Sequence, residues 1–233
     1  QSSFRQQSVN KPSTCCLMIA SMKKAIAKLS FNTKRVPYQK LRAQLNTGDL
    51  VLFSGTTFSS RIVQLFTFSR WSHIGVIVCL PEHDNKPLLW ELTRASKLPD
   101  IHYGASLGDG VQLVSLDDKL NSYVGDVAIR RLRGGCDEAK RLGLLRELLA
   151  DWQAKPYRNI VQKNLSAWWR GEEATTISQQ GGFCSEFVAE LYKCWQLLPS
   201  DRPSRHYAPQ DFAPNASLKL LQGRLSSAWL LQI

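Results

Sequence analysis

Five short apolar runs in the middle of the chain limit the folds that it can adopt. Each run is rich in aliphatic residues and is followed by polar residues, which is the pattern of buried β-strands. The runs span residues 50–54, 74–80, 88–93, 111–116 and 126–133. Helices are expected at residues 57–68, 136–153 and 183–198, with a shorter helix or turn at 117–123. This arrangement predicts an α+β fold with an antiparallel sheet in one domain.

The size and hydropathy of the chain allow a packed core and exclude several other classes of protein. Its 233 residues are 43% hydrophobic and 21% charged, which suits a large folded domain and not a disordered chain. No run of about 18 apolar residues occurs, so no membrane-spanning helix is predicted. No repeat typical of solenoids or propellers is present. The apolar residues 228–233 are expected to pack back onto the domain.

The positive charge of the chain is concentrated near its N-terminal end. There are 30 basic and 19 acidic residues, a net charge of +11. The first 48 residues contain nine basic residues and no acidic one, which leaves a net charge of +2 from Asp49 onward. We therefore divide the chain into a basic arm, residues 1–40, and a domain, residues 41–233. A nucleic-acid-binding domain carries its charge on its folded face, so no nucleic-acid partner is predicted.

Within the arm, apolar and basic residues fall on opposite sides of an expected helix. The apolar side holds Met18, Met22, Ala25, Ile26 and Leu29, and the basic side holds Lys23, Lys24 and Lys28. Three interpretations stay open. The arm has the composition of a transit peptide, the amphipathicity of a helix on an anionic membrane, where Cys15 and Cys16 could be acylated, or the character of a solvated extension. Peripheral membrane contact is therefore left open, and oligomeric state is not predicted.

The six cysteines do not form a disulfide or metal framework. They are Cys15, Cys16, Cys79, Cys136, Cys184 and Cys194. The last two lie on one expected helix, about 15 Å apart at about 1.5 Å per residue, which is too far for a disulfide. No CxxC pair and no Cys/His cluster with zinc spacing occurs, so neither a metal nor a cofactor is predicted. Reduced thiols indicate an intracellular protein.

Cys184 stands out because it opens the strongest predicted helix. It shares an apolar stripe with Val188, Leu191 and Trp195, so it could be an inert core residue. However, the preceding Gly181-Gly182 pair would let the chain turn sharply into the helix. The free N–H groups and the dipole of a first helical turn would then stabilise a thiolate or an oxyanion. The sequence therefore offers Cys184 as a candidate nucleophile.

A nucleophilic thiol needs an acid–base partner and a group that orients this partner. Among the four histidines, His73 is the one that opens a wholly apolar run; the others lie in polar turns or a proline-rich loop. Glu91 lies within another apolar run, where a carboxylate is rarely left without a partner. If the two runs are neighbouring antiparallel strands, Glu91 can reach His73. Each residue could instead have a purely structural role.

Several segments in fixed order resemble a known superfamily. They are TGDLVLFSG, WSHIGVIV, LLWELT, GVQLVSL, YVGDVAIRRL, GGFCSEFVAELY and YAPQDF. Together they look like the circularly permuted NlpC/p60 papain-like superfamily, in its YiiX/YaeF-like amidase branch, with lecithin:retinol acyltransferase-like proteins as distant relatives. His73 precedes Cys184, which is the permuted order. The resemblance covers about residues 41–212 and leaves the arm unexplained.

The resemblance implies a permuted papain-like fold with the nucleophile at a helix N-terminus. Cys184 would be the nucleophile, His73 the general base and acid, and Glu91 the third member of the constellation. The implied function is a cysteine hydrolase that cleaves an amide bond in a peptide or acylated small molecule through a thioester, with the N–H of Cys184 as oxyanion donor. The alternatives are a lipid acyltransferase or phospholipase of the same superfamily and a non-catalytic ligand-binding module.

Overall fold

A computed structural model describes residues 35–57, 60, 64, 69–93, 96–153 and 179–233. All of them lie in one compact unit, Thr33–Ile233. The arm up to residue 34 and most of the predicted helix at 57–68 lie outside the described residues. The remaining residues of the arm enter a short strand and helix, in which Tyr38 is buried. The division at residue 40 stays a prediction.

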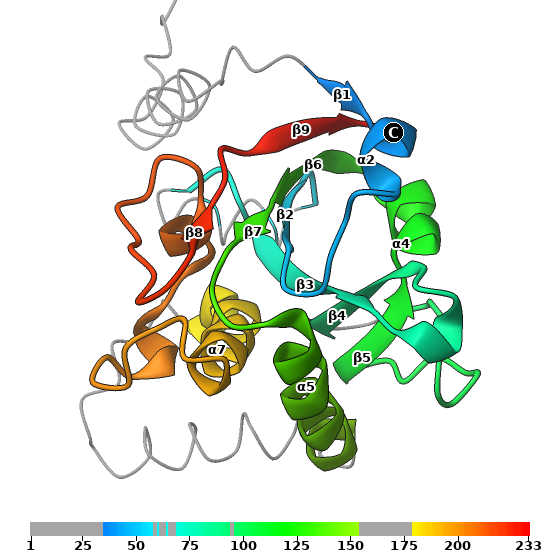
Figure 1. Cartoon of the computed structure of the whole chain (residues 1–233). Helices are drawn as coiled ribbons and strands as arrows, with labels where there is room; N and C mark the ends of the chain where they lie inside the picture. The colour runs from blue at the N-terminus through cyan, green and yellow to red at the C-terminus, as the bar shows by residue number, and fades with distance from the viewer. Residues whose placement is uncertain (1–34, 58–59, 61–63, 65–68, 94–95, 154–178) are drawn as a thin grey trace, which may run out of the picture. The chain divides into compact units, whose positions relative to one another are not determined.

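The centre of the described unit is a seven-stranded sheet (Figure 1). Its strand order is β1-β9-β6-β2-β3-β4-β5, and all neighbours are antiparallel except β1 and β9. The strands are β1 (Val36–Pro37), β2 (Leu50–Gly55), β3 (His73–Cys79), β4 (Pro87–Thr93), β5 (Gly110–Ser115), β6 (Gly125–Arg130) and β9 (Trp229–Gln232). A separate pair joins β7 (Leu132–Arg133) to β8 (Arg224–Leu225). The predicted α+β class with an antiparallel sheet is thus confirmed in its main features.

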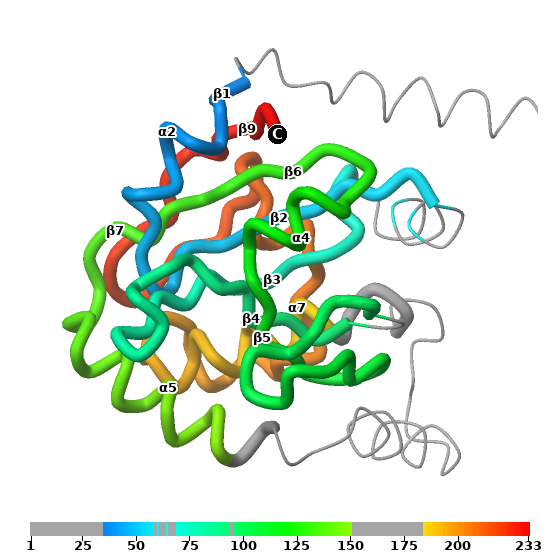
Figure 2. Tube along the Cα trace, turned by 90° about the vertical axis from the view of Figure 1, so that its right-hand side faces the viewer, coloured from blue at the N-terminus to red at the C-terminus, as the bar shows by residue number. Residues whose placement is uncertain are grey.

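Helices cover both faces of this sheet. The long helices α5 (Glu138–Gln153) and α7 (Gln179–Cys194) lie on the opposite side from α2 (Tyr38–Arg42) in both views (Figures 1 and 2). Helix α4 (Leu116–Ser122) shares the core of α2. Short 3-10 turns occur at Pro81–His83, Ser204–His206 and Pro209–Phe212. Because both faces are covered, the strand sequences are apolar almost without interruption.

Each strand divides its side chains between two hydrophobic cores. In β2, Leu50 and Leu52 face the α5 and α7 side, whereas Val51 and Phe53 face the α2 and α4 side. The predicted strands agree with β2 to β6 to within a residue or two, except that 126–133 divides into β6 and β7 at Arg131. The C-terminal run packs back as predicted, because β9 pairs with β6.

Helix α7 differs from its predicted bounds at both ends. It begins at Gln179 and not at Phe183, because the two glycines are accommodated inside the helix instead of ending a loop. It ends at Cys194 and not at Leu198, because Gln196 adopts a left-handed φ of 56°. The N–H of Leu197 then donates to the carbonyl of Tyr192 at 2.8 Å, and that of Gln196 to the carbonyl of Lys193 at 2.8 Å. This is a Schellman C-cap with Gln in the place of the usual Gly.

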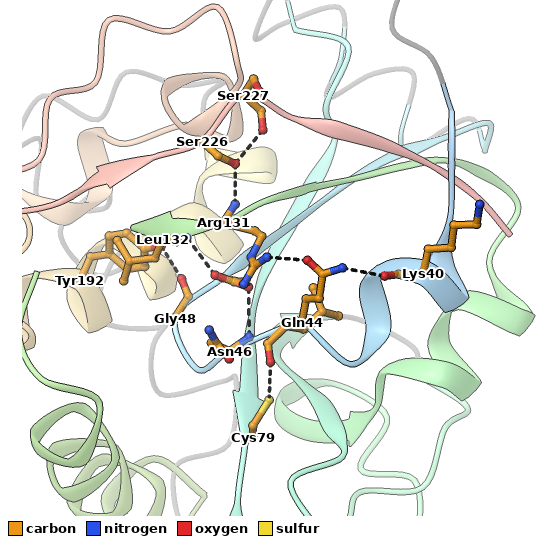
Figure 3. A network of polar contacts seen from close by, with 12 residues as sticks. Lys40, Gln44, Asn46, Gly48, Cys79, Arg131, Leu132, Tyr192, Ser226 and Ser227 are labelled. Atoms are coloured by element: carbon orange, nitrogen blue, oxygen red, sulfur yellow. Dashed lines mark hydrogen bonds and ion pairs between the residues drawn. The ribbon is translucent and has the colours of Figure 1, made fainter. Parts of the chain in front are cut away.

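A buried turn before β2 fastens α7 and β7 to the sheet (Figure 3). The carboxylate of Asp49 accepts hydrogen bonds from the N–H of Leu132 at 2.8 Å and of Asn46 at 3.1 Å. Arg131 Nε lies 3.6 Å from the same carboxylate, and the Tyr192 hydroxyl donates to the carbonyl of Gly48 at 2.7 Å. Burial raises the pKa of Asp49 to about 6, against these hydrogen bonds and the positive charge of Arg131. The turn thus sets the position of α7 over the sheet.

Candidate active site

His73 and Glu91 meet on one face of the sheet because their strands are neighbours. His73 begins β3, Glu91 lies in β4, and the register pairs Val76 with Trp90. Gly75 therefore lies beside Glu91, with His73 two residues further along the same face. The Glu91 side chain passes over Gly75, and its Oε2 lies 2.6 Å from Nε2 of His73. The predicted contact between the two side chains is thus present.

Glu91 is fully buried and all of its described polar partners are side chains. Its second oxygen, Oε1, accepts hydrogen bonds from Nζ of Lys119 at 2.5 Å and from Nε2 of Gln112 at 2.8 Å. Gln112 stands opposite Glu91 on β5, and Lys119 comes from α4. Burial alone would raise the pKa of Glu91, but the charge of Lys119 and the hydrogen bond and charge of His73 lower it to about 2. The carboxylate is therefore ionised at neutral pH.

Cys184 reaches the same imidazole from helix α7. Its side chain is hydrogen-bonded to that of His73, and the residue is buried in the core beneath α7. Burial lowers the pKa of His73, but the charge and hydrogen bond of Cys184, followed by those of Glu91, raise it to about 9. Because Nε2 of His73 is hydrogen-bonded to Glu91, we assign the contact with the thiol to the other ring nitrogen, Nδ1. The imidazole thus lies between a thiol and a carboxylate.

The position of Cys184 within its helix corrects one expectation. Because α7 begins at Gln179, Cys184 lies in the second turn and not at the helix N-terminus. Only the first four N–H groups of a helix lack partners within the helix, and the effect of the dipole falls off beyond the first turn. The N–H of Cys184 is therefore not free to act as the predicted oxyanion donor. The chemical partner that the structure gives to Cys184 is His73.

Aromatic and hydroxyl groups surround the imidazole on the side of β2. The ring centroid of Phe53 lies 5.5 Å from that of His73 and 4.9 Å from that of Tyr123. The Tyr123 hydroxyl is hydrogen-bonded to Ser72, whose Oγ also contacts the Gly55 N–H at 3.2 Å. The side chain of His73 is 20% exposed, whereas Glu91 is entirely buried. A reactant can therefore approach the imidazole, whereas the carboxylate stays behind it.

The structure brings together all three residues that the sequence offered: Cys184, His73 and Glu91. Their catalytic role stays a prediction. Sequence reasoning missed Gln112 and Lys119. A polar residue in the apolar run at 111–116 could have indicated Gln112, but nothing in the helix 116–122 marks Lys119 as a residue of the site. The other histidines lie outside this site. The rings of His83 and His102 pack edge-to-face with their centroids 6.2 Å apart, and His206 is exposed.

Neither a metal-binding cluster nor a membrane-spanning helix occurs in the described part of the chain. Among the described residues, no group of three or more His, Cys, Asp or Glu side chains is arranged to hold a metal ion. No helix within the same ranges has the length and apolar character needed to cross a bilayer.

Comparisons with known proteins give likeness to solved structures but not to family models or curated proteins. No protein-family model and no curated protein matches the chain. Among solved structures, the chain is similar to the metalloprotein yiiX from Escherichia coli O157:H7, described as DUF1105. The sequences are 19% identical, the TM-score is 0.43, and the match covers 81% of this chain and 97% of the other. A likeness this distant carries no argument about fold or function.

Proposed function

We propose that the chain is a cysteine hydrolase with a permuted papain-like fold. In this proposal Cys184 is the nucleophile, His73 the general base and acid, and Glu91 the residue that orients and charges the imidazole. The substrate is an amide in a peptide or acylated small molecule. One observation carries the proposal: the imidazole of His73 is hydrogen-bonded to a thiol on one side and to a buried, ionised carboxylate on the other.

The geometry supports an ordinary acyl transfer through a thioester. His73 takes the proton of Cys184, and the thiolate attacks the carbonyl carbon, so that a C–S bond forms. The imidazolium then gives its proton to the leaving nitrogen as the C–N bond breaks. Water, deprotonated by His73, attacks the thioester, releases the acid and restores the thiol. In both half-reactions the imidazolium is stabilised by Glu91, which agrees with the raised pKa of His73.

The fold assignment rests on the order and placement of these residues. The resemblance to permuted NlpC/p60 proteins requires His73 on a strand that precedes the cysteine helix in the sequence. In the structure, β3 carries His73, and α7, which carries Cys184, packs against β3 and β4. This placement of the helix, the sheet and the His–Glu pair supports the proposal, although Cys184 lies one turn later in its helix than the resemblance implies.

The test is acylation by p-nitrophenyl acetate, a small activated ester. We expect a burst of p-nitrophenol and one acetyl group on Cys184, read by mass spectrometry of the intact chain and its peptides. Cys184→Ala should abolish the burst, and His73→Ala should slow it by about 10²- to 10⁴-fold, the usual contribution of general acid–base catalysis. Peptide and acylated-amine libraries would then identify the substrate.

Cys194 provides the matched control. It lies at the end of the same helix and is exposed as a residue, and partial desolvation of its thiol and the charge of Glu190 raise its pKa. Cys194→Ala should leave the burst unchanged. If acetylation instead follows exposure, so that Cys194 is labelled and Cys184 is not, the hydrolase proposal is wrong and the ligand-binding module takes its place.

A lipid acyltransferase or phospholipase is the second candidate, because the acid-free arm has the composition of a membrane-surface helix. It predicts that the full chain floats with vesicles containing phosphatidylserine, and that replacing Lys23, Lys24 and Lys28 by Gln abolishes flotation. It also predicts acyl transfer from a phospholipid to an amine in the same vesicles. Flotation that does not depend on the arm would count against membrane contact through this segment.

A further inference from the structure

Lys119 is a partly buried cation next to the candidate site that the mechanism above does not use. Its side chain is 13% exposed, and Nζ lies 2.5 Å from Oε1 of Glu91. Nζ also lies 5.6 Å from the centre of the Phe53 ring, the same ring that packs beside His73. Lysine is rarely buried, because removing an ammonium from water is costly without a close counter-ion. A largely desolvated lysine that contacts the carboxylate behind a candidate catalytic histidine therefore requires an explanation.

The charged side chains of the site alternate in sign. Lys119 contacts Glu91, Glu91 contacts His73, and His73 contacts Cys184. These groups come from α4, β4, β3 and α7, which are the elements that meet around the imidazole. Tyr123 also faces Glu91, but burial raises the pKa of its hydroxyl above the ordinary value, so it stays neutral. In the form ready for attack, these four groups are an ammonium, a carboxylate, an imidazolium and a thiolate. Each charge then lies beside one of opposite sign.

Glu91 depends on this cation for its charge. A fully buried carboxylate is disfavoured by the loss of water, and Lys119 is the largest influence that opposes this effect. Lys119 and Gln112 also occupy Oε1, which leaves Oε2 as the oxygen directed at His73. The two roles are separable, because Gln112 can orient the carboxylate but carries no charge.

The position of Lys119 is itself held from the other side of α4. The hydroxyl of Ser115 caps the helix by accepting from the N–H of Asp118 at 3.2 Å. Asp117 accepts from Nη2 of Arg42 at 2.7 Å and from the hydroxyl of Tyr38 at 2.6 Å, which ties α4 to α2. Lys119 thus extends from a helix that is fixed at its first turn, directly over Phe53 and Glu91.

We propose that Lys119 is a positioning residue for the cysteine chemistry: it keeps Glu91 ionised in its buried site and, with Gln112, directs one carboxylate oxygen at His73. The inference rests on the proposed function for its catalytic meaning, but it makes a claim about charge that can be measured without a substrate. A purely structural ion pair would hold α4 in place and leave the titration of His73 and the pH profile of the thiol unchanged.

The experiment is a titration by NMR of the full chain labelled with ¹³C at glutamate carboxyl and histidine ring carbons. Glu91→Gln and His73→Ala identify the two signals by their loss. In the wild type, Glu91 should stay ionised down to pH 4. In Lys119→Met the Glu91 midpoint should move to higher pH by at least about one pH unit, the change expected for loss of a buried counter-ion. Lys119→Arg should restore it.

Lys86→Met is the control for net charge, because Lys86 is exposed and pairs only with the exposed Asp84 among the described residues. It should leave both midpoints unchanged. A Glu91 midpoint that is equal in Lys119→Met and wild type overturns the proposal. If Lys119→Met does not fold, the wild type and Lys119→Arg still decide, because a wild-type Glu91 that titrates above its ordinary pKa overturns the proposal equally.

The catalytic part has its own readout, which is the rate of Cys184 acetylation by p-nitrophenyl acetate between pH 4 and 9. Where Glu91 of Lys119→Met is protonated, it no longer stabilises the imidazolium of the imidazolium–thiolate pair. The rate should therefore fall toward acidic pH at a higher pH in this variant than in the wild type. If the rate falls at the same acidic pH in Lys119→Met and in the wild type, Lys119 has a structural role only. Absence of acetylation at every pH in the wild type would refute the hydrolase, and the NMR titration would still decide the charge of Glu91.

Discussion

At the scale of single residues, Gly75 is where the contact between His73 and Glu91 is most easily broken. A Cβ at this position would lie 2.7 Å from Cδ1 of Leu89, 3.1 Å from the carbonyl oxygen of Trp90 and 3.2 Å from Cβ of Glu91. Gly75→Ala must therefore displace the Leu89 side chain, and it should shift Glu91 by a few tenths of an ångström relative to the imidazole. We expect a loss of about 1–3 kcal/mol in the free energy of unfolding, measured in urea, because the core here is already full. The His73 pKa, followed by NMR, should fall.

Gly143 is the matched control for this substitution. It is exposed within α5, and a Cβ there would meet no atom within 4 Å. Gly143→Ala should raise the free energy of unfolding by about 0.5–1 kcal/mol, because alanine loses less chain entropy in a helix. If Gly75→Ala behaves like Gly143→Ala, the β3–β4 contact is looser than described, and glycine is not required beside Glu91.

The residues of the site also show how far a sequence can be interpreted. Cys184, His73 and Glu91 could be proposed from their places in the sequence: a thiol after two glycines at the start of a predicted helix, a histidine at a strand start and a carboxylate inside an apolar run. The contact between His73 and Glu91 depends on the strand register, which the uninterrupted apolar runs of β3 and β4 do not specify. Lys119 could not be found in this way, because a lysine in a short polar helix is normally exposed, and its burial results from where α4 packs.

At the scale of elements, the strands were predictable and the ends of α7 were not. Runs of aliphatic residues bounded by turns specify strands that are buried on both faces, and β2 to β6 follow them closely. The end of α7 depends on Gln196 in the left-handed region, where glycine is the usual signal. Its start depends on two glycines that a local pattern assigns to a turn. In both cases the surrounding packing outweighs the local preference of the residue.

Arg130 connects the central sheet to the C-terminal segment. Its guanidinium donates to the carbonyls of Phe212 and Ala213 at 2.8 Å each and of Ser226 at 2.8 Å, and the residue is buried. Arg130→Met should lower the free energy of unfolding by roughly 3 kcal/mol or more, because buried carbonyls lose a charged donor. Backbone N–H groups of β8 and β9 should exchange faster with deuterium, which mass spectrometry measures peptide by peptide.

Two variants make this prediction specific to the guanidinium. Arg130→Lys should recover only part of the lost stability, since a single ammonium cannot reach carbonyls in three directions. Arg133→Met, on the neighbouring strand β7, removes an exposed arginine and should change stability by less than about 0.5 kcal/mol. Full recovery of stability in Arg130→Lys would show that the positive charge stabilises this contact and that the planar geometry of the guanidinium does not.

At the scale of the whole molecule, the buried Asp49 and Glu91 and the partly buried His73 have large effects on how stability varies with pH. The pKa of Asp49 is raised to about 6 by burial, and that of His73 to about 9, mainly by Cys184 and Glu91 against its burial. Both groups bind protons more tightly in the folded state, so their stabilisation is complete at low pH. It is lost as pH rises from 3.8 to about 6 for Asp49 and from 6.5 to about 9 for His73.

Glu91 has the opposite sign. Its pKa is lowered from 4.5 to about 2, by Lys119 and His73 against its burial, so its stabilisation is complete above pH 4.5 and is lost as pH falls toward 2. The stabilisation from Glu91 rises up to about pH 4.5, whereas that from Asp49 falls from pH 3.8 upward. The free energy of unfolding should therefore be highest at about pH 4, well below neutrality. Urea unfolding at a series of pH values from 3 to 9 measures this directly.

Two substitutions assign the slopes on either side of that maximum. Glu91→Gln removes the acidic titration, so the loss of stability between pH 4.5 and 3 should become shallower, even though the variant is less stable overall because Lys119 loses its counter-ion. Asp49→Asn removes the titration between pH 3.8 and 6, so stability there should no longer fall as pH rises. A wild-type maximum at pH 7 or above would mean that neither His73 nor Asp49 is more basic in the folded protein than in the unfolded chain. The thiol–imidazole pair of the proposed mechanism would then have no support from the stability of the fold.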